Sequence, residues 1–151
     1  MLSSYVDTND VEDLKSLIGI LDIKHFSCSN CCVLNPTFGE GSSIVGGADA
    51  DLVIDDMIVD IKVTKHLKFA QGYYNQLVGY FVLSKIDSVY AKDDERIATD
   101  IKRVAIYYAR HGYLHVIIDK RSLSKFIRWL EKRAAEMFLE KSHQKTKQAT
   151  F

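Results

Sequence analysis

Four charged side chains interrupt the apolar stretch GGADADLVIDDMIVDIKVTK, which runs from residue 46 to residue 65. Asp49 and Asp51 precede its first apolar run, and Asp60 and Lys62 lie in its second run, where a core strand would carry further hydrophobes. Two carboxylates held close together suit a divalent cation, which prefers oxygen ligands. An ammonium group beside them suits a site that handles an attacking water molecule and a phosphate. The residue types therefore indicate metal-assisted phosphate chemistry, provided that the chain brings them together.

A β-hairpin with Asp55-Asp56 as its two-residue turn would bring these charges together. The turn pairs Ile54 with Met57, and by the same count it sets Asp51 opposite Asp60. Because successive side chains of a strand point to opposite faces, the hairpin has an apolar face and a charged face. The apolar face comprises Leu52, Ile54, Met57, Val59 and Ile61. The charged face comprises Asp49, Asp51, Asp60 and Lys62, with Asp49 opposite Lys62.

The same pattern has a simpler interpretation. An exposed sheet face with solvated charges, on which Asp49 and Lys62 form an ordinary cross-strand pair, is the commoner arrangement for a generic hairpin. Directly opposed side chains have Cβ atoms about 4.5–5.5 Å apart, and like charges in that relation are destabilising. The hairpin alone therefore leaves both a metal site and a solvated face open.

Periodicity and turn signals predict the elements that precede the hairpin. Asn9 and Glu12 have capping-box spacing and predict the start of a helix. Its apolar face comprises Val11, Leu14, Leu17, Ile18 and Leu21. Residues 25–47 are rich in Cys, Gly, Ser and Asn and predict an irregular connection.

A second helix is expected over about residues 67–84, after the hairpin. Its apolar stripe comprises Phe69, Tyr73, Gln76, Tyr80 and Leu83, at intervals of three and four. Within this stripe, the primary amide of Gln76 would be costly to bury unless it is hydrogen-bonded. A core amide satisfied by backbone groups is one interpretation, and a functional amide close to the acid-bearing face is the favoured one.

The C-terminal half completes an α/β pattern. AKDDERIATD predicts a loop, RVAIYYA a strand that is apolar on both faces, RHG a turn and YLHVIID a further strand. A C-terminal amphipathic helix is then marked by Leu123, Phe126, Ile127, Leu130, Ala134 and Phe138. This order of elements predicts an α/β layered domain with a mixed sheet flanked by helices.

Composition limits the remaining classes. The length of 151 residues and the 47% apolar content suit one domain, expected over residues 1–140, with 141–151 a frayed basic tail. The 20 basic and 20 acidic residues cancel, so attraction to nucleic acid would need a local patch. Three cysteines make no disulfide framework. Without a visible signal peptide or an apolar span of about 18 residues, we expect a cytoplasmic protein and no membrane partner.

The charged hairpin and the helix after it resemble a known signature. Asp51, followed by Asp60 and Lys62 in a D-x-K triplet, is similar to the core motif of the PD-(D/E)xK nuclease superfamily. Gln76 and Tyr80 of QLVGY match the Q-x-x-x-Y element of its RecB-like branch, on the helix after the D-x-K strand. The resemblance covers about residues 45–84. It implies a restriction-endonuclease-like fold with three layers, and a deoxyribonuclease that acts on DNA.

The resemblance also implies a role for each matched residue. Asp51 and Asp60 would hold Mg²⁺ or Mn²⁺ with the backbone carbonyl of Ile61, and Asp49 is the alternative ligand. The metal would lower the pKa of its bound water and offset charge on the phosphate. Lys62 would orient or help deprotonate that water, and Gln76 and Tyr80 would position the DNA backbone or the lysine. The alternative function is a catalytically degenerate module of the same fold that binds nucleic acid or a protein.

RecB-like nucleases usually carry a further acid, a Glu on a helix before the first strand. The predicted first helix offers Glu12 and Asp13. Glu12 falls opposite the apolar face, where the capping box accounts for it. Asp13 lies at the edge of that face and is the better candidate for a further metal ligand.

Two groups of basic residues are candidate DNA contacts. Lys65, His66 and Lys68 follow the D-x-K strand, and Arg110 and His111 lie near the end of a later strand. Each could bind a phosphate, and each could equally be a solvated surface charge.

The segment HFSCSNCC contains four possible metal ligands close together in the sequence: His25, Cys28, Cys31 and Cys32. Zinc accepts such ligands, but structural zinc sites typically draw two pairs from separated segments. Ordinary thiols are therefore favoured over a metal site.

Overall fold

A computed structural model describes residues 7–90, 100–119, 128–129 and 132, and the predicted loop at 91–99 and tail at 141–151 lie outside these ranges. Its helices are α1 (Thr8–Gly19), α2 (Gly39–Val45) and α3 (Gln71–Tyr90), with short 3-10 helices η1 (Ile23–Phe26) and η2 (Ala109–His111). Its strands are β1 (Cys32–Leu34), β2 (Leu52–Ile54), β3 (Met57–Lys62), β4 (Arg103–Tyr108) and β5 (Tyr113–Asp119). The predicted C-terminal helix also falls almost wholly outside the described ranges.

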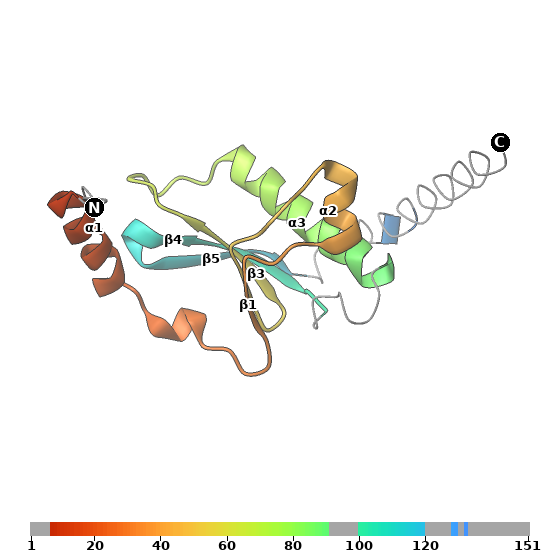
Figure 1. Cartoon of the computed structure of the whole chain (residues 1–151), viewed down its shortest axis with the longest axis horizontal. Helices are drawn as coiled ribbons and strands as arrows, with labels where there is room; N and C mark the ends of the chain where they lie inside the picture. Colours follow the sequence, from red (N-terminus) through yellow and green to blue (C-terminus); the bar gives the residue numbers. More distant parts are fainter. Residues whose placement is uncertain (1–6, 91–99, 120–127, 130–131, 133–151) are drawn as a thin grey trace, which may run out of the picture.

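The strands form one five-stranded sheet in the order β1-β2-β3-β4-β5 (Figure 1). β3 and β4 are parallel, while the other neighbouring pairs are antiparallel. The parallel pair requires a crossover connection, and α3 lies within it. The predicted α/β class with a mixed sheet is therefore confirmed.

The hairpin between β2 and β3 has the predicted register. Ile54 pairs with Met57 and Leu52 with Val59, so Asp55 and Asp56 form the turn. Asp55 has φ 52°, in the left-handed region that such tight turns require. Its carboxylate accepts backbone N–H groups of residues 29–31, which lowers the pKa of Asp55.

Both faces of the sheet are apolar at its centre. On one face, α3 and the residue before α2 pack against β2, β3 and β4, through Phe38, Val53, Ile58, Leu77, Phe81, Val104 and Ile106. Figure 1 shows α2 and α3 side by side over this face. The other face carries the predicted apolar residues Leu52, Ile54, Met57 and Val59, which pack with Leu17 of α1 and Phe26 of η1. The face that carries Asp60 is thus the one covered by α3.

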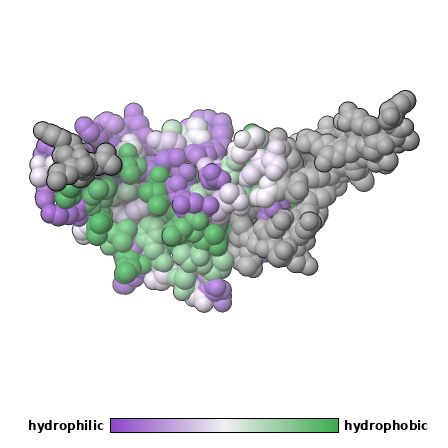
Figure 2. Space-filling view, viewed as in Figure 1, coloured by the Kyte–Doolittle hydropathy of each residue, from purple (hydrophilic) through white to green (hydrophobic). Residues whose placement is uncertain are grey.

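The first helix differs from its prediction. Its N-cap is Asp7, whose side chain accepts the N–H of Asn9, so Asn9 is not the cap. Glu12 pairs with Lys15 on the helix surface and is not part of a capping box. The apolar face packs through Leu17, while Leu14, Ile18 and Leu21 are exposed. Figure 2 shows a further group of hydrophobic residues on the surface over η1 and β1, where Ile23 and Leu34 are exposed.

The prediction of an irregular connection over residues 25–47 is wrong, because the segment contains β1 and α2. The glycines that predicted a loop have other roles, and Gly41 serves close packing. A Cβ atom on Gly41 would lie 2.7 Å from the carbonyl oxygen of Leu83 on α3, so only glycine lets the two helices approach this closely. Gly46 ends α2 at φ 81°, a left-handed C-cap.

Candidate active site

Asp60 is the buried acid of the candidate site. It lies on β3 and faces α3, and only 3% of its surface is exposed. Burial raises the pKa of Asp60, a shift that the hydrogen bond and charge of Lys62 oppose and that the charge of Asp51 reinforces. A buried carboxylate whose charge is disfavoured is a group that a bound cation would stabilise.

Lys62 stands at the centre of a chain of polar contacts. Its Nζ lies 2.7 Å from Oδ2 of Asp60 and donates a hydrogen bond of 2.9 Å to Oε1 of Gln76. The same ammonium lies 5.1 Å from the centre of the Tyr73 ring, within the range of a cation–π contact. Lys62 is therefore held by three residues: Asp60 on its own strand, and Gln76 and Tyr73 on α3.

The amide of Gln76 continues the chain along α3. Its Nε2 donates a hydrogen bond of 2.7 Å to the hydroxyl oxygen of Tyr80, one helical turn further on. The ring of Phe38, just before α2, stacks on the Tyr80 ring with centroids 5.5 Å apart. Burial raises the pKa of Tyr80, so its hydroxyl keeps its proton at neutral pH. The prediction that the Gln76 amide is hydrogen-bonded near the acid-bearing face is confirmed, and its partners are side chains.

Asp51 reaches the same place from the other strand of the hairpin. It is exposed, and its carboxylate accepts the backbone N–H of Ile61 at 2.6 Å. The neighbouring pair Leu52–Val59 sets Asp51 opposite Asp60, as predicted from the turn. The two acids therefore differ in exposure, since one faces solvent and the other is covered by α3.

Asp49 does not pair with Lys62. It lies before β2 and forms an isolated bridge with Thr37, on the side of the hairpin away from β3. The ammonium of Lys62 instead contacts Asp60 and Gln76. The simple cross-strand pair between Asp49 and Lys62 is thus wrong, because the ladder between β2 and β3 begins only at Leu52.

Asp13, the predicted further ligand, binds Arg110 instead. Both guanidinium NH groups of Arg110 donate to the Asp13 carboxylate, at 2.7 and 2.6 Å. Asp13 lies on α1, whose Leu17 packs on the face opposite to Asp60. Two residues predicted for different roles, metal binding and DNA contact, therefore bind each other and tie α1 to the end of β4.

The other predicted basic residues are exposed. Lys65, His66 and Lys68 lie in the segment between β3 and α3, directly after Lys62. His111 lies in η2, next to Arg110. The first three therefore lie in the segment that leads from Lys62 of β3 to α3.

The donor set fits an open magnesium-type site. In the part of the chain that the structure describes, no group of three or more His, Cys, Asp or Glu side chains is arranged to hold a metal ion. Magnesium, however, keeps several waters and is commonly bound by one or two carboxylates together with substrate phosphates. Asp51 and Asp60 supply two carboxylates, and Ile61 between Asp60 and Lys62 can add its backbone carbonyl.

Helix α2 was missed in the sequence, and it carries an acid. Glu40 is its second residue, two positions after Phe38, whose ring stacks on Tyr80. The helix precedes β2, the strand that follows Asp51. Glu40 therefore occupies the kind of position in the chain that was sought in the first helix. The sequence signal for it was the run FGEGSS, whose glycines indicated a loop.

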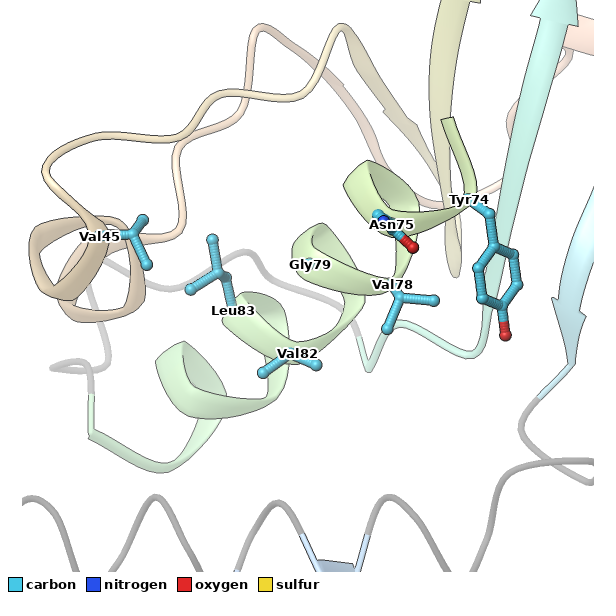
Figure 3. Close-up of a pocket in the computed structure, with 7 residues that line it drawn as sticks. All are labelled: Val45, Tyr74, Asn75, Val78, Gly79, Val82 and Leu83. Atoms are coloured by element: carbon cyan, nitrogen blue, oxygen red, sulfur yellow. The ribbon is translucent and has the colours of Figure 1, made fainter. Parts of the chain in front are cut away.

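Two further features lie apart from these acids. A cavity of about 400 Å³ is lined by Val45, Tyr74, Asn75, Val78, Gly79, Val82 and Leu83, on α3 and the end of α2 (Figure 3). It contains neither carboxylate nor ammonium, so it does not suit phosphate chemistry. Cys28, Cys31 and Cys32 are free thiols, and local desolvation together with the nearby Cys28 raises the pKa of Cys32, which is exposed.

Comparison with known proteins places the chain in no family: no family model, curated protein or solved structure matches it. Among the described residues, no helix is long and apolar enough to cross a membrane.

Proposed function

We propose that the protein is a Mg²⁺- or Mn²⁺-dependent nuclease that hydrolyses phosphodiester bonds of DNA. The observation that carries this proposal is the continuous chain of contacts from Asp60 through Lys62 and Gln76 to Tyr80. It links the D-x-K and Q-x-x-x-Y residues, which the sequence separates by a loop and part of a helix. A solvated sheet face would not require this connection.

Each residue in this series of contacts would have a task of its own. Asp51 and Asp60 would hold the cation, which when bound supplies an activated water and neutralises phosphate charge. Lys62 lies next to Asp60, and its ammonium can orient that water. Gln76 fixes the ammonium through Oε1, and its other end is held by Tyr80. A lysine oriented in advance loses little freedom when substrate binds, which favours the reaction.

The test is hydrolysis of linear and circular, single- and double-stranded DNA with Mg²⁺, Mn²⁺ or EDTA. Activity should need the metal and should be lost in Lys62→Ala. Lys24→Ala, at an exposed lysine of η1, is the matched control and should cleave like the wild type. If Lys62→Ala retained wild-type turnover, the assignment would be wrong.

A degenerate, non-catalytic module is the second candidate. Asp13, the acid expected on the first helix, binds Arg110 instead, and this favours it. Binding of DNA without hydrolysis, at any metal concentration tried, would be its signature in the same assay.

A further inference from the structure

The sheet register extends the candidate site toward β5. Asp60 pairs with Ile106, and Ile106 pairs with His115. In the next row, Lys62 pairs with Tyr108, and Tyr108 with Tyr113. Directly paired residues of neighbouring strands point to the same face of a sheet. His115 and Tyr113 therefore lie on the face that carries Asp60 and Lys62, two strands away, which is roughly 10 Å.

Aromatic rings cover this part of the face, and we call Phe69, Tyr74, Tyr113 and His115 the aromatic platform. The rings of Tyr113 and His115 are stacked, with centroids 6.0 Å apart and planes at 27°. Phe69 meets His115 and Tyr74 edge to face, at 5.9 and 6.1 Å. Tyr113 also stacks on the buried Tyr108, at 6.5 Å. The rings thus form one connected surface.

The platform is open to solvent. Phe69 is 51% exposed and Tyr113 is 46% exposed. Large aromatic rings are costly to leave in water, and a connected group of them marks a binding surface more often than a single exposed ring does. Their polar edges, a phenol and an imidazole, also allow hydrogen bonds to a partner.

Cationic groups adjoin the platform along the segment between β3 and α3. The cations are Lys65 and Lys68, which are exposed there, and Phe69 follows Lys68. The hydroxyl of Tyr108 donates a hydrogen bond of 3.2 Å to the carbonyl oxygen of Lys68, which fixes the segment to the sheet. Rings for stacking, with cations along one side, are what proteins use to bind single-stranded nucleic acid.

We propose that the aromatic platform binds unpaired nucleobases of single-stranded nucleic acid and delivers the adjoining backbone to Asp60 and Lys62. The inference rests on the proposed function for the chemistry at that end, while the binding itself does not depend on hydrolysis. Bases within a duplex are already stacked and cannot lie on these rings, so the platform would select single strands or frayed ends.

Binding is measured by fluorescence anisotropy in EDTA, where no hydrolysis occurs. The probes are a short single-stranded oligonucleotide, an abasic strand of equal length and a blunt duplex of that sequence. Tyr113→Leu and Phe69→Leu keep apolar bulk but remove the ring, and Tyr113→Trp keeps a ring. The matched control is Val116→Ala, at an exposed residue of β5 that pairs with Ala105 and so lies on the other face.

Tyr113→Leu and Phe69→Leu should each weaken binding of the normal single strand about 5- to 100-fold. Tyr113→Trp and Val116→Ala should bind it like the wild type. The abasic strand should bind weakly to every variant. The inference is overturned if Tyr113→Leu binds the normal strand unchanged, or if it weakens both strands equally while Tm is unaltered.

The two proposals fail in different ways. If base-dependent binding is found but Lys62→Ala hydrolyses DNA as well as the wild type, the proposed nuclease site is wrong and the platform stands. If hydrolysis depends on Lys62 but the abasic strand binds as tightly as the normal one, the platform is wrong and the nuclease site stands.

Discussion

Two pairs of an acid and a base, Asp60–Lys62 and Asp13–Arg110, contain residues that the sequence marks as functional, and their environments are opposite. The side chains of Asp60 and Lys62 are 4% and 21% exposed, whereas those of Asp13 and Arg110 are 42% and 33% exposed. Burial raises the pKa of Asp60 in spite of its lysine. The hydrogen bond from Arg110 lowers the pKa of Asp13.

The contrast separates a candidate site from a structural tie. Both carboxylate oxygens of Asp13 accept hydrogen bonds from Arg110, so the negative charge of Asp13 is already balanced without a metal cation. At Asp60, the fold accepts a charge that its surroundings disfavour, and such a group is more often found where function requires it. Both acids form ion pairs, so the ion pair does not distinguish them. The direction of the pKa shift does, because the pKa of Asp60 is raised and that of Asp13 is lowered.

The largest expected effect is on hydrolysis. Asp60→Asn removes a proposed metal ligand and should lower turnover by roughly 100-fold or more, the scale on which electrostatic groups at a reacting phosphate act. Asp13→Asn should leave turnover within roughly twofold, since its carboxylate serves Arg110 alone in this scheme. Steady-state cleavage of DNA in Mn²⁺ measures both. Equal losses would erase the distinction between the two pairs.

A smaller loss is expected from the residues that hold the lysine. Gln76→Ala removes the acceptor of the Lys62 ammonium, and misplaced catalytic groups cost up to about 100-fold, so a loss of roughly 10- to 100-fold is expected. Tyr80→Phe removes only the hydroxyl behind the amide and should cost less. Asn75→Ala, the exposed neighbour that bonds Gln71, is the control. A greater loss in Tyr80→Phe than in Gln76→Ala would reverse the proposed order of contacts.

The hairpin could be predicted because its information is local. A two-residue turn and the alternation of side chains determine which residues oppose one another, so the Asp51–Asp60 pairing followed without tertiary knowledge. Gln76 could be predicted for a similar reason, since a primary amide in an apolar stripe needs a partner.

What could not be predicted depends on contacts between distant segments. Asp13 and Arg110 are 97 positions apart, and nothing local indicates that they meet. Helix α2 was missed because Gly39 and Gly41 predict a loop when considered alone, whereas packing against α3 makes glycine necessary at Gly41. The exposed face of α1 was likewise unpredictable, because amphipathic spacing indicates which residues share a face but not whether that face is covered.

In EDTA, removing the charge of each acid should change the melting temperature in opposite directions. Burial disfavours the charge of Asp60, and the opposed charge of Asp51 adds a cost on the order of 0.2–1 kcal/mol, while the contact with Lys62 offsets part of this cost. Asp60→Asn removes the charge and keeps the shape. The variant should therefore melt above the wild type, by a few °C at most.

Millimolar Mn²⁺ should reverse this order, because the cation stabilises only the folded state that binds it and the variant has lost a ligand. Asp13→Asn should melt below the wild type with or without metal. A metal-independent difference for Asp60→Asn would mean that Asp60 binds no cation.

The smallest effect is the dependence of these differences on pH, and its sign follows from the direction of each pKa shift. Asp13 has a folded pKa below its ordinary value of 3.8, so its stabilising contribution is present above that pH and is lost as the pH falls through the folded pKa. Asp60 has a folded pKa above 3.8, so its contribution is present below that pH and is lost as the pH rises through the folded pKa.

The Tm of the wild type minus that of Asp13→Asn should therefore increase with pH in the acid range. The same difference for Asp60→Asn should decrease with pH, starting above 3.8. Melts in EDTA across this range measure both slopes, and the Asp13 difference should shrink between about 0.1 and 1 M salt because that pair is exposed. Two slopes of the same sign would show that burial does not control the ionisation of Asp60, and with that the distinction between the two pairs would lose its physical basis.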